Sequence, residues 1–166
     1  METTRFVEKG ALGIPGARIL LVEDDEVLRE LILLNLRTRG HEVCFAADAR
    51  TALAQLKATS FDLVFLDINL PDQTGWEVLR IAQREGRLPP VQANGLAGRL
   101  PVVVLSAVRV GPRRLQEFQP LAYLPKPFPM EAILRLAAEA AGRRNGEVIS
   151  ETKAPGVLLD EEKLHA

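Results

Sequence analysis

The segment FDLVFLDINLPDQTGW, residues 61–76, places four consecutive apolar residues directly before an aspartate. The apolar run at residues 63–66 is too short for a helix and has polar neighbours, which favours a strand buried on both faces. Asp67 stands where this run ends, and Pro71 then indicates a loop. Because ligands of open α/β sheets bind outside the carboxyl ends of the strands, Asp67 is a candidate site residue. Taken alone, an aspartate that caps the loop or faces solvent is an equally good interpretation.

The rest of the chain repeats this alternation between short apolar runs and helical patterns. The apolar runs predict five strands, at residues 19–22, 42–45, 63–66, 101–105 and 121–124. Apolar residues recur with the helical period at residues 26–39, 48–58, 75–85, 112–118 and 129–143. Strands that alternate with helices are typical of a parallel sheet covered by helices on both faces.

Single residues indicate where some of these helices begin and end, and which face is buried. Gly40 follows the first helical pattern and is a typical C-terminal stop, while Asp48 is placed to cap the second helix. In the first helix we expect Leu28, Leu31 and Ile32 to share the buried face.

The length of 166 residues predicts one domain, which we place at residues 17–143. Residues 1–16 mix charges with glycine and proline and show no periodicity, so we expect a flexible N-terminal arm. Residues 144–166 are polar and aperiodic, so we expect a poorly ordered C-terminal tail. Residues 87–100 contain several prolines and glycines and predict a surface loop.

The composition excludes several classes of protein. The net charge of −1 gives no electrostatic reason for binding to nucleic acid or to an anionic membrane. The single cysteine, Cys44, excludes an internal disulfide and fits a reducing compartment. No apolar segment resembles a signal peptide or reaches the length of a transmembrane helix. We therefore expect a cytoplasmic protein.

Polar side chains follow four of the five predicted strands. Right-handed crossovers bring the carboxyl ends of these strands to one edge of the sheet. The residues expected at that edge are Glu23, Asp24, Asp67, Ser106 and Lys126. Each has an ordinary explanation when considered alone, such as an acid near a helix N-terminus or an exposed loop lysine. Their occurrence at four separate strand ends favours a common site.

Four motifs in this order resemble the receiver domain of bacterial response regulators: LLVEDD at 20–25, LVFLDINLPDQTGWE at 63–77, VVVLSA at 102–107 and YLPKPF at 123–128. The resemblance covers about residues 17–141. It implies a flavodoxin-like, doubly wound α/β fold in which a five-stranded parallel sheet has the strand order 2-1-3-4-5 and helices on both faces. It also implies that Asp67 accepts a phosphoryl group from a sensor histidine kinase or a phosphotransfer protein.

The resemblance further implies a Mg²⁺ site next to the phosphoacceptor. Asp24, Asp67 and the backbone carbonyl of Asn69 would bind the metal directly, and Glu23 would act through water. The chemistry of the side chains agrees, because two carboxylates about 4 Å apart repel each other by about 4 kcal/mol at an effective dielectric near 20. Lys126 removes only part of that excess charge, and a hard divalent cation with oxygen ligands restores the balance.

Other residues acquire roles by the same resemblance. Lys126, the Ser106 hydroxyl and the Ala107 backbone N–H would contact the phosphoryl group. Ser106 would then swing toward the phosphate while Tyr123, on the fifth strand, turns inward as the second part of a switch. The peptide bond between Lys126 and Pro127 is expected to be cis, as it usually is in the family.

The resemblance implies a signalling phosphoacceptor rather than an enzyme. A downstream protein would contact the fourth helix, the fifth strand and the last helix, and the protein would be a monomer or weak dimer that does not bind nucleic acid directly. Two alternatives stay open. One is a Mg²⁺-dependent phosphatase of the haloacid dehalogenase type, although Asn69 stands where such enzymes carry a second aspartate. The other is a receiver-like interaction module that is not phosphorylated.

Overall fold

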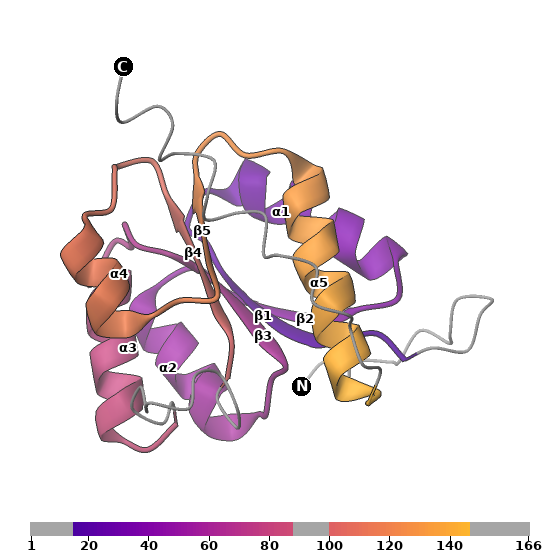
Figure 1. The fold of residues 1–166 in the computed structure, drawn as a ribbon, viewed down its shortest axis with the longest axis horizontal. Helices are drawn as coiled ribbons and strands as arrows, with labels where there is room; N and C mark the ends of the chain where they lie inside the picture. Colours follow the sequence, from indigo (N-terminus) through magenta and orange to yellow (C-terminus); the bar gives the residue numbers. More distant parts are fainter. Residues whose placement is uncertain (1–14, 88–99, 147–166) are drawn as a thin grey trace.

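The computed structural model describes residues 15–87 and 100–146, which form a five-stranded parallel sheet with helices on both faces (Figure 1). The strands are β1 (Arg18–Val22), β2 (Glu42–Ala46), β3 (Leu63–Asp67), β4 (Val102–Ser106) and β5 (Ala122–Pro125). The helices are α1 (Glu26–Thr38), α2 (Ala49–Ala58), α3 (Gly75–Arg84), α4 (Pro112–Phe118) and α5 (Met130–Arg144). The strand order is β2-β1-β3-β4-β5, so the predicted fold class is confirmed.

The sheet separates two hydrophobic layers. Alternate residues of β1 point to opposite sides. Ile19 belongs to a hydrophobic cluster with residues of α1 and α5, and Leu20 belongs to a second cluster with residues of α2, α3 and α4. All five residues of β3 and of β4 are buried, as expected for central strands of a parallel sheet. Figure 1 shows α1 and α5 on one side of the sheet and α2, α3 and α4 on the other.

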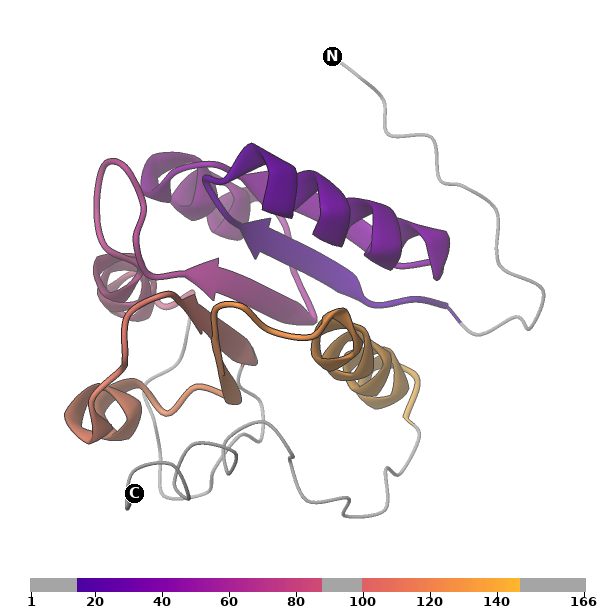
Figure 2. The same ribbon diagram turned by 90° about the horizontal axis from the view of Figure 1, so that it is seen from above.

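The register of the strands brings their carboxyl ends to one edge. Val22 of β1 is level with Leu66 of β3, and Asp67 is level with Leu105 of β4. The residue that follows β1 therefore lies beside the last residue of β3. Figure 2 shows the strand arrowheads pointing to the same side of the molecule.

The buried face of α1 differs from the prediction. Ile32, Leu33 and Leu36 are buried, whereas Leu31 is 49% exposed. The segment LILLNL has apolar residues on several sides of the helix, so its periodicity does not decide which leucine faces the sheet. As a result, Leu31 joins Val27 and Leu34 on the solvent side, where these two residues are 81% and 65% exposed.

The predicted signals for helix ends are confirmed. The Asp48 side chain accepts a hydrogen bond from Thr51 N–H at 2.7 Å and caps α2. Gly40 has φ of +84° just after α1, a conformation that glycine adopts without strain.

The two ends of the described domain meet. Arg144 Nη1 donates to the Gly16 carbonyl at 3.0 Å, and Asn145 Nδ2 donates to the Pro15 carbonyl at the same distance. These residues belong to the segments that the sequence interpretation assigned to the arm and the tail. Residues 1–14, 88–99 and 147–166, which contain most of the arm, loop and tail predictions, lie outside the described residues. None of the described helices is both long and apolar enough to cross a membrane.

Candidate functional site

Three carboxylates meet at the carboxyl edge of the sheet, where β1 and β3 end. Glu23 and Asp24 follow β1, and Asp67 is the last residue of β3. One oxygen atom from each of the three carboxylates lies within 4.8 Å of the others. Glu23 and Asp67 are 0% and 3% exposed, whereas Asp24 faces solvent. The structure thus brings together the three acids that the sequence placed at this edge.

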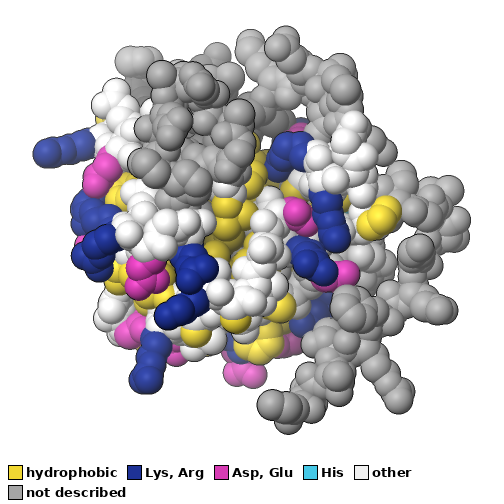
Figure 3. All heavy atoms as spheres, turned by 90° about the horizontal axis from the view of Figure 1, so that it is seen from below, with side chains coloured by type: hydrophobic (Ala, Val, Ile, Leu, Met, Phe, Trp, Pro, Cys, Tyr) yellow, Lys and Arg dark blue, Asp and Glu magenta, His cyan; other side chains and the backbone are white. Residues whose placement is uncertain are grey.

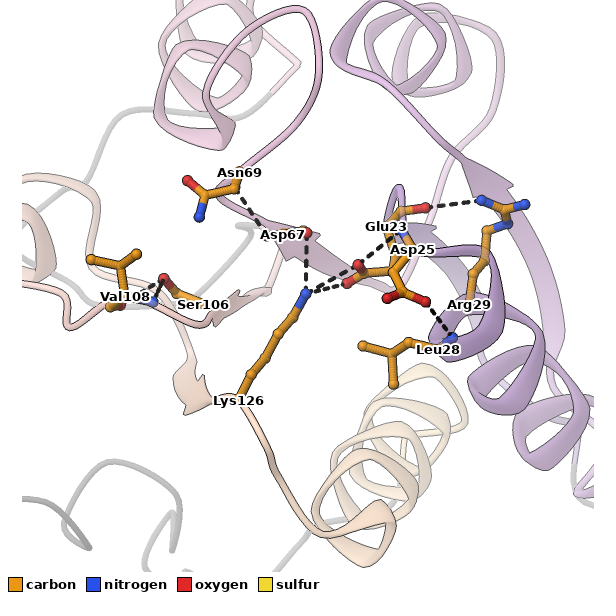
Figure 4. Close-up of polar contacts among 9 residues, drawn as sticks. All are labelled: Glu23, Asp25, Leu28, Arg29, Asp67, Asn69, Ser106, Val108 and Lys126. Atoms are coloured by element: carbon orange, nitrogen blue, oxygen red, sulfur yellow. Dashed lines mark hydrogen bonds and ion pairs between the residues drawn. The ribbon is translucent and has the colours of Figure 1, made fainter.

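Lys126 reaches these acids from the segment that follows β5 (Figure 4). Its ammonium donates to the two oxygens of Glu23 at 3.0 and 2.8 Å, and to Asp67 Oδ2 at 3.2 Å. Its backbone N–H donates to the Ser106 carbonyl at 2.8 Å, which ties the segment to β4. The bond between Lys126 and Pro127 is cis, as the resemblance implied.

Burial and charge shift the protonation of this cluster. Burial raises the pKa of Glu23 to about 7, and the negative charge of Asp67 acts in the same direction, against the hydrogen bond from Lys126. Burial alone would lower the pKa of Lys126, but the interactions with Glu23 and Asp67 outweigh it and raise the pKa. Because Glu23 is partly protonated near pH 7, one ammonium faces two aspartates and a partly ionised glutamate, and the cluster keeps an excess of negative charge.

The three acidic residues after β1, Glu23 to Asp25, have two different functions. Asp25 is the N-cap of α1, where its side chain accepts a hydrogen bond from Leu28 N–H at 2.9 Å. Its own N–H donates to Glu23 Oε1 at 3.2 Å. Asp25 is therefore a structural residue that also helps to hold Glu23, while the other two acids face the cluster.

The loop after β3 is held close to Asp67. Asn69 N–H donates to Asp67 Oδ1 at 2.9 Å, and Gly75 N–H donates to the Ile68 carbonyl at 2.8 Å. Gly75 lies so close to the end of β3 that an added Cβ would stand 2.6 Å from the Asp67 carbonyl oxygen. Glycine at this position thus lets α3 begin immediately beside the site.

Ser106 and Tyr123 are connected through one backbone carbonyl. Ser106 Oγ donates to the Val108 carbonyl at 2.6 Å and accepts from Val108 N–H at 3.1 Å. The Tyr123 hydroxyl donates to the same carbonyl at 3.4 Å. In this structure the serine is therefore turned toward its own loop rather than toward Asp67.

Sequence reasoning missed the two groups that organise these loops. The Val108 carbonyl is a backbone acceptor, and its side chain carries no signal for this role. Asp72 follows Pro71 in the predicted loop and belongs to no pattern that points to another segment, but its carboxylate accepts hydrogen bonds from the backbone N–H groups of Ala49 and Arg50 in α2. No local pattern connects these segments, which are separated by more than twenty residues.

Comparison with known proteins identifies the family. The model of the response regulator receiver domain matches residues 19–138, which include every residue of the site described above. The chain belongs to this family. Its members are signalling proteins, so the receiver identity predicted from the four motifs is confirmed.

Several curated relatives of this receiver are transcriptional regulators. It is 34% identical to the transcriptional activator protein PfeR of Pseudomonas aeruginosa, over 92% of this chain and 50% of PfeR. It is 30% identical to the phosphate regulon transcriptional regulatory protein PhoB of the same organism, over 87% of this chain and 61% of PhoB. The chain thus spans about half the length of the curated relatives it matches first.

Solved receiver structures share the fold. The receiver domain of a sensor histidine kinase of Pseudomonas aeruginosa, solved with a magnesium ion coordinated in its active site cleft, is 30% identical, with a TM-score of 0.61 over 76% of this chain and 98% of that one. The chemotaxis response regulator CheY4 of Vibrio cholerae is 27% identical, with a TM-score of 0.61 over 75% of this chain and 98% of that one.

Proposed function

We propose that this receiver accepts a phosphoryl group on Asp67 from a histidine kinase or phosphotransfer protein. The observation that carries the proposal is a buried strand-end carboxylate 3.2 Å from a lysine ammonium and beside two further acids. An Asp67 oxygen would form the new bond to phosphorus. The bond between phosphorus and the donor atom would break, and its electron pair would stay on the donor. The Lys126 ammonium would neutralise charge on the transferred oxygens.

The same acids fit a divalent cation. Three clustered carboxylates opposed by one ammonium are a hard-oxygen donor set with excess negative charge, which suits Mg²⁺. We assign the metal to Asp24, Asp67 and the Asn69 carbonyl, with Glu23 acting through water. When bound, Mg²⁺ would supply positive charge that stabilises the phosphoryl oxygens.

The switch would begin at the loop after β4. Ser106 would exchange its hydrogen bond to the Val108 carbonyl for one to the phosphoryl group, beside the Ala107 backbone N–H. The carbonyl is then left to Tyr123, whose hydroxyl already points to it. This rearrangement would change the surface formed by α4, β5 and α5, which we propose as the binding surface for the downstream protein.

The exposed apolar residues of α1 support a place for the phosphodonor. α1 begins two residues after Asp24, so its first turn lies next to the acidic cluster. Val27, Leu31 and Leu34 recur on that face at helical spacing and are largely exposed. We propose that the helix that carries the donor histidine packs on this stripe.

The charge distribution argues for protein partners. On the face drawn in Figure 3, basic and acidic side chains are intermixed around a band of hydrophobic side chains. Two arginines of α3 and α4 are paired with acids: Arg80 contacts Glu77 at 2.7 Å and Glu117 at 3.0 Å, and Arg114 contacts Glu117 at 3.3 Å. We propose that the domain of residues 17–143 works in the cytoplasm as a monomer or weak dimer without binding nucleic acid itself.

The phosphoacceptor assignment can be tested with acetyl phosphate as a small-molecule donor. Incubation with Mg²⁺ should add one phosphoryl group to the wild-type protein, measured by intact mass. Asp67→Asn should abolish this adduct, because the amide cannot act as the nucleophile. Asp48→Asn is the matched control, since it changes an aspartate that caps α2 outside the cluster. Labelling of Asp67→Asn at the wild-type level would contradict the assignment.

A further inference from the structure

Asp72 links the loop after β3 to the first turn of α2. Its Oδ1 accepts from Ala49 N–H at 2.8 Å, and its Oδ2 accepts from Arg50 N–H at 3.1 Å. Oδ1 also accepts from Gln73 N–H at 3.0 Å within its own loop. A single carboxylate therefore bridges two segments that are distant in the sequence.

Two aspartates from different segments share the N-terminus of α2. Asp48, the N-cap, accepts a hydrogen bond from Thr51 N–H at 2.7 Å. Asp72 accepts hydrogen bonds from the N–H groups of Ala49 and Arg50. These are among the first N–H groups of a helix, which have no partner within the helix, and they carry the positive end of its dipole. Hydrogen bonds to a charged acceptor are stronger than neutral ones. The attachment therefore suits an ionised carboxylate, and the hydrogen bond from Ala49 is the main cause of the lowered pKa of Asp72.

The attached loop is the one that carries part of the proposed metal site. Asn69 lies three residues before Asp72, and its N–H holds Asp67 Oδ1. The base of the loop is closed by the bridge between Asn69 and Thr74 and by the Gly75 N–H bond to Ile68. Asp72 adds a lateral attachment at the tip, which limits rotation of the loop about its base.

We propose that Asp72 is a positioning residue that holds the Asn69 carbonyl in place for Mg²⁺ by fixing the loop to α2. This inference rests on the proposed function, since it assumes that the acidic cluster binds the metal. Asp72 itself does not contact the metal. Its effect comes from removing loop conformations in which the carbonyl is turned away from Asp67 and Asp24.

The proposal has a reciprocal consequence in α2. If the attachment favours the loop conformation that binds Mg²⁺, then Mg²⁺ must favour the attachment by the same factor. Binding at Asp67 should therefore reduce opening of the hydrogen bonds that Ala49 and Arg50 make to Asp72. Thr51 serves as an internal control, because its N–H is held by Asp48 rather than by the loop.

Calorimetric titration with Mg²⁺ tests the first consequence. Asp72→Ala should weaken binding at least about fivefold, the lower end of usual coupling between sites. Asp48→Ala is the matched control, because it removes a carboxylate from the same helix end but leaves the loop attached. The affinity of this variant for Mg²⁺ should change less than about twofold. Equal affinities of Asp72→Ala and wild type would overturn the proposal. A wild-type protein that binds no Mg²⁺ would overturn the proposed metal site as well, so the two failures are distinguishable.

Hydrogen exchange of the wild-type protein tests the second consequence without any substitution. Saturating Mg²⁺ should slow exchange of the Ala49 and Arg50 amides several-fold, with a smaller change at Thr51. This measurement stands even if Asp72→Ala fails to fold. Unchanged exchange at Ala49 and Arg50, in a protein that binds the metal, would overturn the proposal.

Discussion

At the scale of single residues, Ser106 and Lys126 lie at the same edge of the sheet but have different partners. Lys126 is engaged with both buried acids, so its charge is part of the resting electrostatic balance. Ser106 Oγ is hydrogen-bonded to the Val108 backbone rather than to Asp67. We therefore expect the lysine to affect the chemistry in both states and the serine to affect only the phosphorylated one.

This difference predicts that Ser106→Ala separates phosphorylation from switching. The variant should still accept phosphate at Asp67, because it loses one neutral hydrogen bond worth about 0.5–1.5 kcal/mol. It should lose the NMR shift changes at residues 107–124 on addition of beryllofluoride with Mg²⁺, since the bond to be gained is absent. Lys126→Ala should instead impair formation of the adduct itself. Identical shift changes in wild type and Ser106→Ala would exclude Ser106 as the switch.

The side chains of the site were predictable because each follows a strand, and parallel strands end at one edge. The sequence therefore placed Glu23, Asp67 and Lys126 correctly next to one another. It could not reveal the role of the Val108 carbonyl, since every residue carries such a group. Nor could it connect Asp72 with α2, because that contact depends on the path of the loop rather than on a local pattern.

At the scale of elements, the ends of the helices and strands were predicted to within about one residue, but the buried face of a helix was not always predicted. Each strand begins and ends near the apolar run that indicated it, because buried strands need continuous apolar sequence. In α1 the sequence is apolar on several sides, so Leu31 was wrongly assigned to the core. Only the packing of α1 against α5 and the sheet decides which face is buried.

The junction between α1 and β2 predicts a pH dependence of stability. His41 Nδ1 accepts from Ala17 N–H at 3.0 Å and must be unprotonated to do so. Burial lowers the pKa of His41 below its ordinary 6.5, and the charge of Arg39 adds to this. Below about pH 6.5 the unfolded chain therefore binds a proton that the folded chain does not, so the free energy of unfolding falls as the pH falls.

Chemical denaturation between about pH 5 and about pH 8 measures this contribution as a difference between variants. Glu23 acts in the opposite direction, because its raised pKa favours the folded state at lower pH. His41→Leu should remove only the histidine's contribution, and His165→Leu removes the one other histidine as a control. The same pH dependence in wild type and His41→Leu would contradict the assignment.

At the scale of the whole molecule, the fold gathers acidic side chains at the carboxyl edge of the sheet. Strand order and parallel pairing were predictable from the four motifs and from the alternation of elements. The joining of residues 15–16 to the end of α5 was not, because it involves backbone carbonyls and a helix terminus.

Because Mg²⁺ would bind only the folded arrangement of the acids, it should stabilise the whole domain. At a Mg²⁺ concentration about one hundred times Kd, the free energy of unfolding should rise by about 2.7 kcal/mol. Asp24→Ala should lose this gain, and its metal-free form should be at least as stable as wild type because one repulsive charge is removed. Thermal unfolding with and without Mg²⁺ checks both. An equal gain in Asp24→Ala and wild type would contradict the metal assignment.

The contact between α3 and α4 has a practical consequence. Trp76, the single tryptophan of the chain, stacks on Phe118 at the end of α4, with 5.2 Å between ring centroids and 22° between the ring planes. Indole emission depends on what lies against the ring, so any shift of α4 relative to α3 changes the light that this protein emits. The receiver thus carries an intrinsic optical reporter at the contact between α3 and α4, and a movement of α4 can be followed in real time without a dye.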